Sequence, residues 1–208
     1  AAAAFEDLLT DHLRVLGSDH PDTLTTRSHL AHWRGEAGDA AGAAAATEDL
    51  LTDHLRVLGS DHPDTLASRG NLAYWRREAG DAAGAAAAFE DLLTDHLRVL
   101  GSDHPDTLTT RSHLARSRGQ AGDAAGAAAA FEDLLTDRLQ VLGPDHPNTL
   151  TSRSHLAHWR GQAGDAAGAA AAFEDLLTDH LRVLGPDHPH TLTTRSYLAY
   201  WRGRAGLV

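Results

Sequence analysis

An internal repeat with a period of 42 residues constrains this chain more than any other feature. The junction Gly38-Asp39 returns as Gly80-Asp81, Gly122-Asp123 and Gly164-Asp165, with no insertion or deletion between the copies. A fixed period between about 20 and 50 residues is typical of stacked repeats, in which each unit packs on its neighbours. The sequence therefore predicts a repeat array in place of one globular core.

Each repeat predicts two helices. In the first full copy a Ser-Asp-His-Pro turn precedes a helix expected over about 21–37, and Pro21 suits the first helical position, where its missing N–H costs nothing. Gly38 suits the end of that helix, and Asp39 suits the N-cap of a second helix over about 40–58. Below, helices that follow the His-Pro turn are A-type and helices that follow the Gly-Asp junction are B-type.

The repeats divide the chain without an obvious linker. We expect one array over residues 1–208, which begins with a B-type helix over 1–16. The repeat units then span 18–59, 60–101, 102–143 and 144–185, and an A-type helix over 186–208 ends the array. Because Ala1 stands inside a predicted helix and is not Met, we expect this array to be a fragment of a longer protein.

Composition limits the partners. The formal net charge is −11 and the isoelectric point is about 5.7, which argues against nucleic acid and anionic membrane surfaces as partners. The absence of cysteine excludes disulfides and thiolate sites. No apolar run predicts a membrane span or a signal peptide, so we expect a cytoplasmic protein. Arginine supplies every basic side chain other than histidine, which suggests a GC-rich bacterial genome, actinobacterial in appearance.

Several motif residues resemble a known family. The pattern Leu72-Ala73, Gly80, Ala85, Phe89 and Leu92 resembles tetratricopeptide repeats, and the 42-residue period with its Leu-Gly-Ser/Pro-Asp-His-Pro turn resembles the bacterial kinesin-light-chain-like type. The resemblance implies an all-α fold, a right-handed superhelical solenoid of about five two-helix repeats. It also implies that A-type helices line a concave groove for a peptide or a segment of a partner protein.

Positions that differ between near-identical copies indicate where a partner would bind. On the open face of the A-type helices these positions are aromatic, hydrogen-bonding or cationic, and Tyr and Arg are favoured binding anchors. We hypothesise that Tyr74, Arg116 and His158 form the centre of this surface; the alternative is neutral drift on a solvated face. The predicted partner-binding residues are Ser28, His29, His32, Glu36, Asn71, Tyr74, Glu78, His113, Arg116, Gln120, His155, His158, Gln162, Tyr197 and Tyr200.

Two arginines depart from the family pattern. Arg27 and Arg34 recur in every copy within the predicted apolar arc of the A-type helix, where an unpaired buried charge would be costly. We therefore predict an ion-pair ladder between these arginines and carboxylates of the B-type helix. Glu48, Asp49 and Asp53 are the candidate acceptors, and a role of the arginines in anion binding is the alternative.

The histidines and serines do not predict a metal or catalytic site. His29 and His32 have a spacing that could chelate a metal, but no carboxylate or cysteine completes a repeated site. The spacing also lapses at Asn71 and Tyr74, so we expect no metal and no cofactor. A Ser/His/Asp triad can be drawn in any repeat and therefore carries no information, so we expect no catalytic residue and no enzyme. His54 and its counterparts are expected to be half-buried and hydrogen-bonded.

The leading functional prediction is a non-catalytic scaffold for protein–protein interaction through the A-type helices. Two alternatives stay open. The first is a structural repeat that self-assembles head to tail, since Phe5 and Leu9 at one end and Leu198 and Trp201 at the other would lack polar caps. The second is a sensor or regulatory arm of a larger bacterial switch protein.

Overall fold

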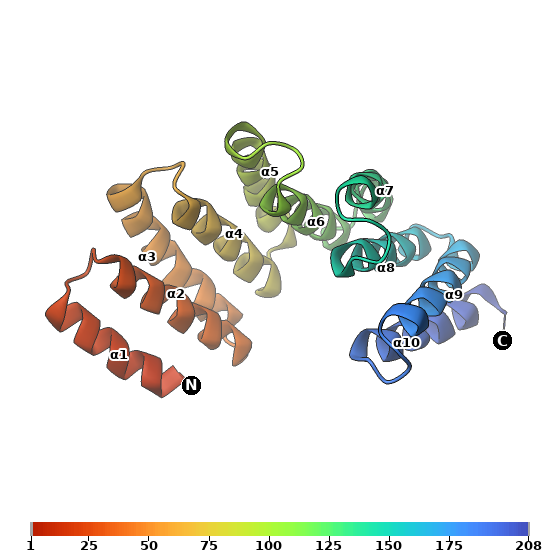
Figure 1. The fold of residues 1–208 in the computed structure, drawn as a ribbon, viewed down its shortest axis with the longest axis horizontal. Helices are drawn as coiled ribbons and strands as arrows, with labels where there is room; N and C mark the ends of the chain where they lie inside the picture. The colour runs from red at the N-terminus through yellow and green to blue at the C-terminus, as the bar shows by residue number, and fades with distance from the viewer. Residues whose placement is uncertain (1, 208) are drawn as a thin grey trace. The chain divides into compact units, whose positions relative to one another are not determined.

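A computed structural model describes residues 2–207, and within this range it consists of ten α-helices without a strand (Figure 1). The all-α prediction of about five two-helix repeats is confirmed. A-type helices have even numbers and B-type helices odd numbers. The helices are α1 (Ala2–Val15), α2 (Pro21–Glu36), α3 (Ala40–Leu58), α4 (Pro63–Glu78), α5 (Ala82–Val99), α6 (Pro105–Gln120), α7 (Ala124–Val141), α8 (Pro147–Gln162), α9 (Ala166–Val183) and α10 (Pro189–Ala205).

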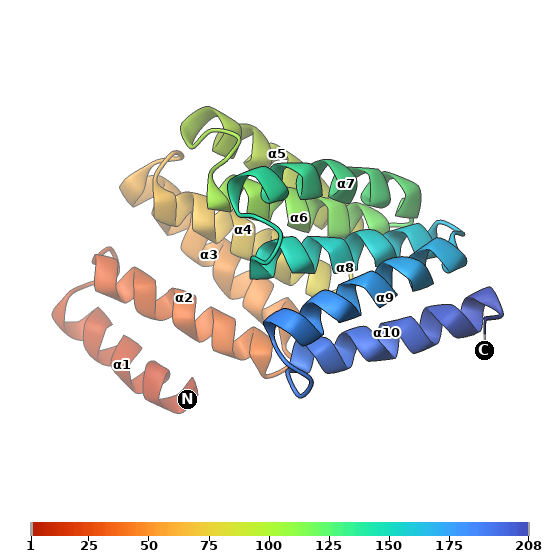
Figure 2. The ribbon, with the colours of Figure 1, turned by 45° about the vertical axis from the view of Figure 1, so that its right-hand side comes forward.

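The helices fall into two compact units, one ending at Ser102 and one beginning at Asp103. In the first unit consecutive helices pack on one another from α1 through to α5, and in the second unit they do so from α6 through to α10. Figure 2 shows α8, α9 and α10 running side by side within the second unit.

Side-chain caps start both kinds of helix. In the first full copy the Nδ1 atom of His20 accepts a hydrogen bond from the backbone N–H of Asp22 at 3.2 Å, and all four later copies repeat this cap. The histidine of the His-Pro turn is therefore structural, as its recurrence predicts. Asp39 accepts from the N–H of Gly42 at 2.8 Å, and a Cβ at Gly42 would lie 2.1 Å from the Asp39 carboxylate. A side chain at this position would overlap the capping carboxylate, which explains why glycine stands three residues after the cap.

The apolar core is a row of small clusters. In one cluster Phe131 and Leu134 of α7 are fully buried together with Leu108 of α6 and Leu156 of α8. A cluster of the same composition is centred on Phe173 of α9. In the second unit, α7 and α9 therefore each bury an apolar stripe against the A-type helix before and the A-type helix after, as in a repeat protein whose units stabilise their neighbours.

Tryptophan rings pack on glycines between repeats. A Cβ added to Gly35 would lie 2.2 Å from the ring of Trp75, and Gly161 and Trp201 show the same contact at 2.6 Å. Trp75 and Trp201 are buried, whereas Trp33 in the first copy is 41 % exposed. The prediction that these rings pack is therefore confirmed for Trp75 and Trp201 and was wrong for Trp33. The packing of Trp75 and Trp201 requires glycine on the facing helix, because a side chain there would occupy the place of the ring.

The predicted ion-pair ladder exists. Arg27 of α2 donates to Asp53 of α3 at 2.6 Å, and Asp53 also accepts from Arg56, which forms two hydrogen bonds to Asp19 in the turn before α2. Each four-residue network of this kind ties an A-type helix and its turn to the B-type helix that follows. The other complete networks are Arg69, Asp95, Arg98 and Asp61, and Arg153, Asp179, Arg182 and Asp145.

The expected burial of Arg34 was wrong. Its side chain is 56 % exposed and pairs with Asp39 at 2.7 Å. Arg76 pairs instead with Glu48 at 2.9 Å, and Arg160 and Arg202 do the same with Glu132 and Glu174. Arg76, Arg160 and Arg202 thus lie along the surface of the B-type helix of the preceding repeat and do not enter the core.

We expect Gln140→Arg to stabilise the third repeat, because Gln140 stands where Arg56, Arg98 and Arg182 stand in other copies. Asp137 already accepts from Arg111 and would gain a second donor, as Asp179 has in Arg182. The free energy of unfolding should rise by about 0.2–1 kcal/mol at low salt, and less at high salt. Urea unfolding measures it. Gln140→Met, which adds a side chain of similar length without charge, should show no salt-sensitive gain; an equal gain in both variants would contradict the ion-pair origin.

Two glycine-to-alanine changes in helices should have opposite signs. Gly161→Ala places a Cβ 2.6 Å from the Trp201 ring, so we expect a loss of about 1–3 kcal/mol from overpacking. Gly70→Ala places a Cβ 3.5 Å from Leu92, an ordinary contact, so we expect a gain of up to about 1 kcal/mol from helix propensity. Thermal unfolding of both variants measures this, and a stabilised Gly161→Ala would show that the Trp201 contact is loose.

Candidate partner-binding groove

The fifteen predicted partner-binding residues all lie on even-numbered helices, and each of their side chains is exposed or half-buried. The first unit carries Ser28, His29, His32, Glu36, Asn71, Tyr74 and Glu78. The second unit carries His113, Arg116, Gln120, His155, His158, Gln162, Tyr197 and Tyr200. These side chains are accessible, and their role in binding stays a prediction. The predicted centre is divided between the units, with Tyr74 in the first unit and Arg116 and His158 in the second.

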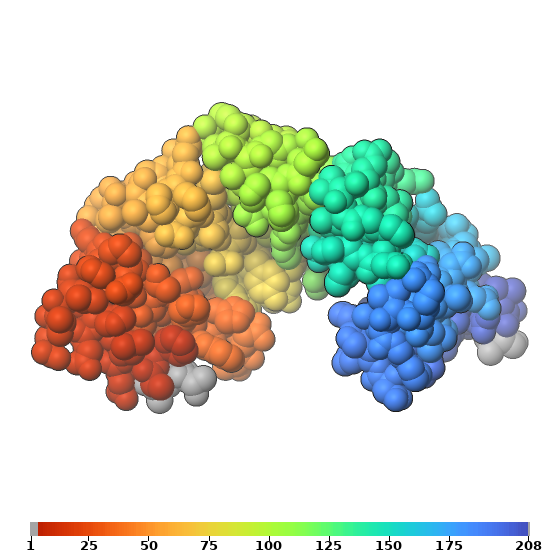
Figure 3. Space-filling view, in the orientation of Figure 1, coloured from red at the N-terminus to blue at the C-terminus, as the bar shows by residue number. Residues whose placement is uncertain are grey.

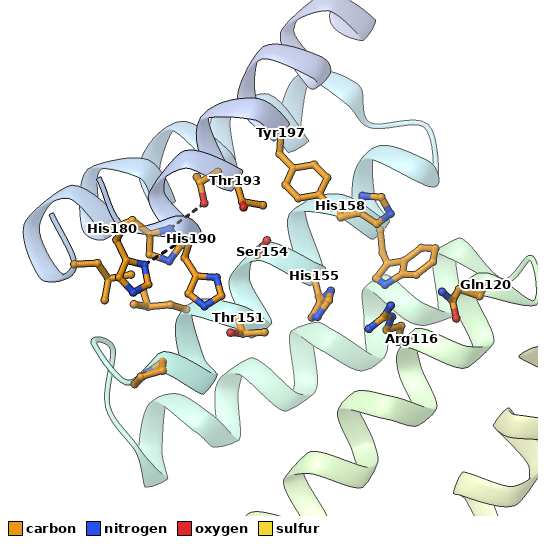
Figure 4. A pocket seen from close by; sticks show the side chains of 16 residues that line it. Arg116, Gln120, Thr151, Ser154, His155, His158, His180, His190, Thr193 and Tyr197 are labelled. Atoms are coloured by element: carbon orange, nitrogen blue, oxygen red, sulfur yellow. Dashed lines mark hydrogen bonds between the residues drawn. The ribbon is translucent and has the colours of Figure 1, made fainter. Parts of the chain in front are cut away.

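The second unit gathers five of these residues around one groove of about 650 Å³. Arg116 and Gln120 come from α6, His155 and His158 from α8, and Tyr197 from α10, as Figure 4 shows. The groove is also lined by residues that the comparison between repeat copies did not select. These are Pro147, Leu150, Thr151, Ser154, Trp159, His180, Leu184, His188, His190, Thr193 and Thr194.

Phenylalanines of the B-type helices position one row of the groove. The ring of His155 stacks on Phe131 with centroids 5.0 Å apart, and Tyr197 stacks on Phe173 at 5.2 Å. His29 packs against Phe5 in the first unit in the same way, at 5.5 Å. His155 and Tyr197 both have planar rings at this position of the A-type helix. One face of each ring covers a buried phenylalanine, and the other face lines the groove.

Aromatic rings also surround His158. Its ring lies edge-on to Trp159 at 5.0 Å and to both Tyr197 and Trp201 at 5.9 Å. The Nδ1 atom of His158 is buried without a hydrogen-bond partner among the residues the structure describes. A buried nitrogen without a partner is costly, so the aromatic neighbours, and not a hydrogen bond at Nδ1, hold this ring in place.

The groove carries cationic and titratable groups but no carboxylate. Its sixteen lining residues include Arg116 and five histidines, whereas the whole chain has 29 acidic residues against 18 arginines. Negative charge is also lost at the second position of the A-type helices. This residue is Asp in the first three copies, Asn148 in the fourth and His190 in the fifth. The groove is thus the part of an acidic protein that is suited to an anionic group.

Burial keeps the central histidines neutral near pH 7. The pKa of His155 is lowered to about 4, first by burial and then by the charge of Arg116. Burial and then Arg116 also lower the pKa of His158, and burial and then His190 lower that of His180. His180 is held by a 2.9 Å hydrogen bond between its Nδ1 atom and the Thr194 hydroxyl, which confirms that this histidine series is buried and hydrogen-bonded.

Comparison of single positions missed two kinds of lining residue. Thr151 and Ser154 vary little between copies, yet they precede His155 and His158 by one turn and so share their face. A helical-face criterion applied to the predicted residues would have found them. His188 and His190 belong to the turn and first turn of α10, and no spacing in the sequence shows that they reach the same groove.

Residues 2–207 contain neither a cluster suited to a metal ion nor a helix suited to a membrane. No group of three or more His, Cys, Asp or Glu side chains there could hold a metal ion. No helix in that range is both long and apolar enough to span a bilayer.

The tetratricopeptide repeat family model matches four consecutive segments, residues 23–64, 65–106, 107–148 and 149–190. These segments cover most of the chain and repeat with the same period as the Gly-Asp junction. The chain therefore belongs to the tetratricopeptide repeat family, and the family prediction is confirmed. No curated protein matches the chain in sequence.

Solved structures agree with this family. The crystal structure of nearly identical TPR-like repeats from a Podosopora anserina protein assigned as a kinesin light chain is 26 % identical. It superimposes with a TM-score of 0.76 over 90 % of this chain and 89 % of that one. BtubC from P. vanneervenii is 19 % identical, with a TM-score of 0.79 over 99 % of this chain and 83 % of that one, and supports the fold alone.

We expect the protein to lose stability between about pH 6.5 and pH 4, partly through His155. Because its folded-state pKa is about 4 and its unfolded value 6.5, the unfolded chain binds more protons in this range and unfolding is favoured as the pH falls. Paired aspartates such as Asp53, whose pKa Arg27 lowers, act at lower pH. His155→Tyr copies the Tyr197–Phe173 stack and should flatten this loss.

Urea unfolding at several pH values checks this expectation. Wild type and His155→Tyr should have similar free energies of unfolding at pH 7, where the imidazole is neutral. An unchanged pH dependence in a variant that is equally stable at pH 7 would show that His155 does not resist protonation in the fold.

Proposed function

We propose that this protein is a non-catalytic interaction scaffold whose even-numbered helices bind a segment of a partner protein. Membership of a family typical of protein–protein interaction scaffolds supports this proposal. The observation that carries it is the groove of the second unit, where five residues chosen for their variation between copies meet on three helices. The remaining ten predicted residues are proposed to extend the binding face along their own helices.

The chemistry of the groove favours a partner segment with carboxylate side chains. Arg116 offers a fixed charge, and the histidines offer hydrogen bonds that become charge-assisted once a carboxylate is near. Tyr197, which is 37 % exposed, adds apolar surface for a side chain of the segment. An acidic segment with one large apolar residue would therefore use both the polar and the apolar part of the lining, and a basic segment would meet the like charge of Arg116.

Binding of acidic peptides should strengthen as the pH falls from about 7.5 to about 5. A carboxylate near His155 and His158 would raise their lowered pKa in the complex, so binding takes up protons and affinity rises with acidity. Fluorescence anisotropy with labelled peptides rich in Glu, Gln or Lys around a central Leu measures this. The Glu-rich peptide should bind most tightly, and added salt should weaken it.

Arg116→Ala should weaken the Glu-rich peptide about tenfold or more, which corresponds to about 1.4 kcal/mol. Arg14→Ala removes an equally positive side chain from an odd-numbered helix and is the matched control. Equal binding by wild type, Arg116→Ala and Arg14→Ala would place the peptide elsewhere. Preference for the Lys-rich peptide would contradict the proposed charge complementarity.

A further inference from the structure

Helix α7 buries an arginine at a position where the other B-type helices have histidine. Arg138 is 4 % exposed, although the outer side of α7 faces solvent in the space-filling view of the second unit (Figure 3). Its counterparts in the other copies are His12, His54, His96 and His180. Burial, and then the charge of Arg111, lower the pKa of Arg138, but a guanidinium stays protonated at neutral pH. The second unit therefore contains a buried positive charge that the other repeats lack.

Every hydrogen bond of this guanidinium goes to an uncharged acceptor. The Nη1 atom of Arg138 donates to the backbone oxygen of Asn148 at 2.9 Å and to the hydroxyl of Ser152 at 2.6 Å. The Nη2 atom donates to the backbone oxygen of Leu108 at 3.2 Å. Among the residues that the structure describes, the Nε atom has no acceptor and no carboxylate pairs with this side chain. The fold thus buries a cation without an internal counterion, which costs free energy.

The copy that contains this arginine has also lost a nearby acid. In the first unit burial lowers the pKa of His54 and the carboxylate of Asp64 raises it, so this carboxylate acts on the buried position. In the copy with Arg138 the counterpart of Asp64 is Asn148. One copy therefore places a carboxylate near a histidine, whereas the other places an amide near a cation. Both exchanges make this part of the second unit more positive.

Arg138 lies on the same buried stripe of α7 that supports the groove. Phe131, Leu134 and Arg138 are buried at helical spacing, and the ring of Phe131 stacks on His155. The charge of Arg138 acts on His155, whose pKa is lowered by burial first and then by the charges of Arg116, His158, Arg138 and His113. Water and salt screen a buried charge less than an exposed one. The charge of Arg138 therefore reaches the groove, although Arg138 does not line it.

We propose that Arg138, together with Asn148, determines the specificity of this groove for anionic partner segments, through charge and without contact with the segment. This inference rests on the proposed function and adds a second permanent positive charge to that of Arg116. Carboxylates of the bound segment would supply the negative charge that the fold does not give to Arg138.

A purely structural role for Arg138 makes a different prediction. Its hydrogen bonds join α6 at Leu108 to α8 at Ser152, so the side chain also holds together two helices that line the groove. Such a tie depends on the geometry of the guanidinium, whereas selection of anions depends on its charge. Substitutions that change one property and keep the other therefore separate the two roles.

Two substitutions reduce the positive charge with residues that other copies already carry. Arg138→His recreates the contact of His54 with Ser68, which is 2.8 Å long, because Ser152 is the counterpart of Ser68. Asn148→Asp recreates the aspartate of the first three copies. The fold accepts both residues at these positions in other repeats, and thermal unfolding establishes that each variant is folded.

Two further variants are the controls. Arg138→Lys keeps the buried charge and loses the guanidinium geometry. Arg160→Gln removes a positive charge from α8 that is half-exposed, pairs with Glu132 and does not line the groove. Both should bind the Glu-rich peptide as tightly as wild type does.

Fluorescence anisotropy with the Glu-rich peptide at about pH 7.5, where buried histidines are neutral, measures the effect in low and in high salt. Arg138→His and Asn148→Asp should each weaken binding about fivefold at low salt, and the difference from wild type should shrink at high salt. Equal losses in Arg138→Lys and Arg138→His would show that Arg138 acts as a tie, which overturns the proposal.

The remaining outcomes distinguish this proposal from the proposed function. If Arg116→Ala weakens the Glu-rich peptide while Arg138→His and Asn148→Asp bind it as wild type does, the groove binds acidic segments and only the role of Arg138 is refuted. If the wild-type chain does not bind the Glu-rich peptide, both proposals are refuted.

Discussion

Each helix of this protein buries a narrow apolar stripe that the neighbouring helices on both sides must cover. The leucine of the B-type helix shows the consequence directly, since Leu50, Leu92, Leu134 and Leu176 are at most 1 % exposed while Leu8 is 42 % exposed. The same side chain on the same kind of helix is therefore buried or exposed according to its neighbours alone. Stability in such an array is shared between repeats, and any repeat at an edge is incomplete.

Polar contacts then define how neighbouring helices meet. A four-residue network such as Arg27, Asp53, Arg56 and Asp19 is partly exposed, so it adds little free energy for its size. The network instead fixes the position of the helices, because the bidentate contact between Arg56 and Asp19 joins a turn to a helix in only one register. The Trp–Gly contacts also fix how neighbouring helices meet, since a tryptophan ring fits only where the facing helix has no side chain.

This framework leaves one face of the A-type helices free to differ between copies. At that face Phe131 and Phe173 require a planar partner but tolerate His or Tyr, so chemistry can change without loss of packing. The groove of the second unit shows such a change, with Arg116 and five histidines and with Asn148 and His190 in place of the aspartates of earlier copies. The groove therefore differs between copies in its side chains, while the helices and the core that carry these side chains stay the same.

The sequence by itself determined the period, the order of the helices, their caps and the family, because all four depend on contacts within about one repeat. It also predicted the pairing of Arg27 with Asp53, since both lie on adjoining helices of one copy. The sequence also predicted Glu48 as an acceptor, but only the tertiary structure decided that Arg34 is exposed and that Arg76 of the next repeat is the arginine that pairs with Glu48. It alone brought His180, His188 and His190 to the groove of His155 and Arg116. A helical wheel treats each helix as isolated, whereas these contacts depend on how a helix and its turn lie against the next repeat.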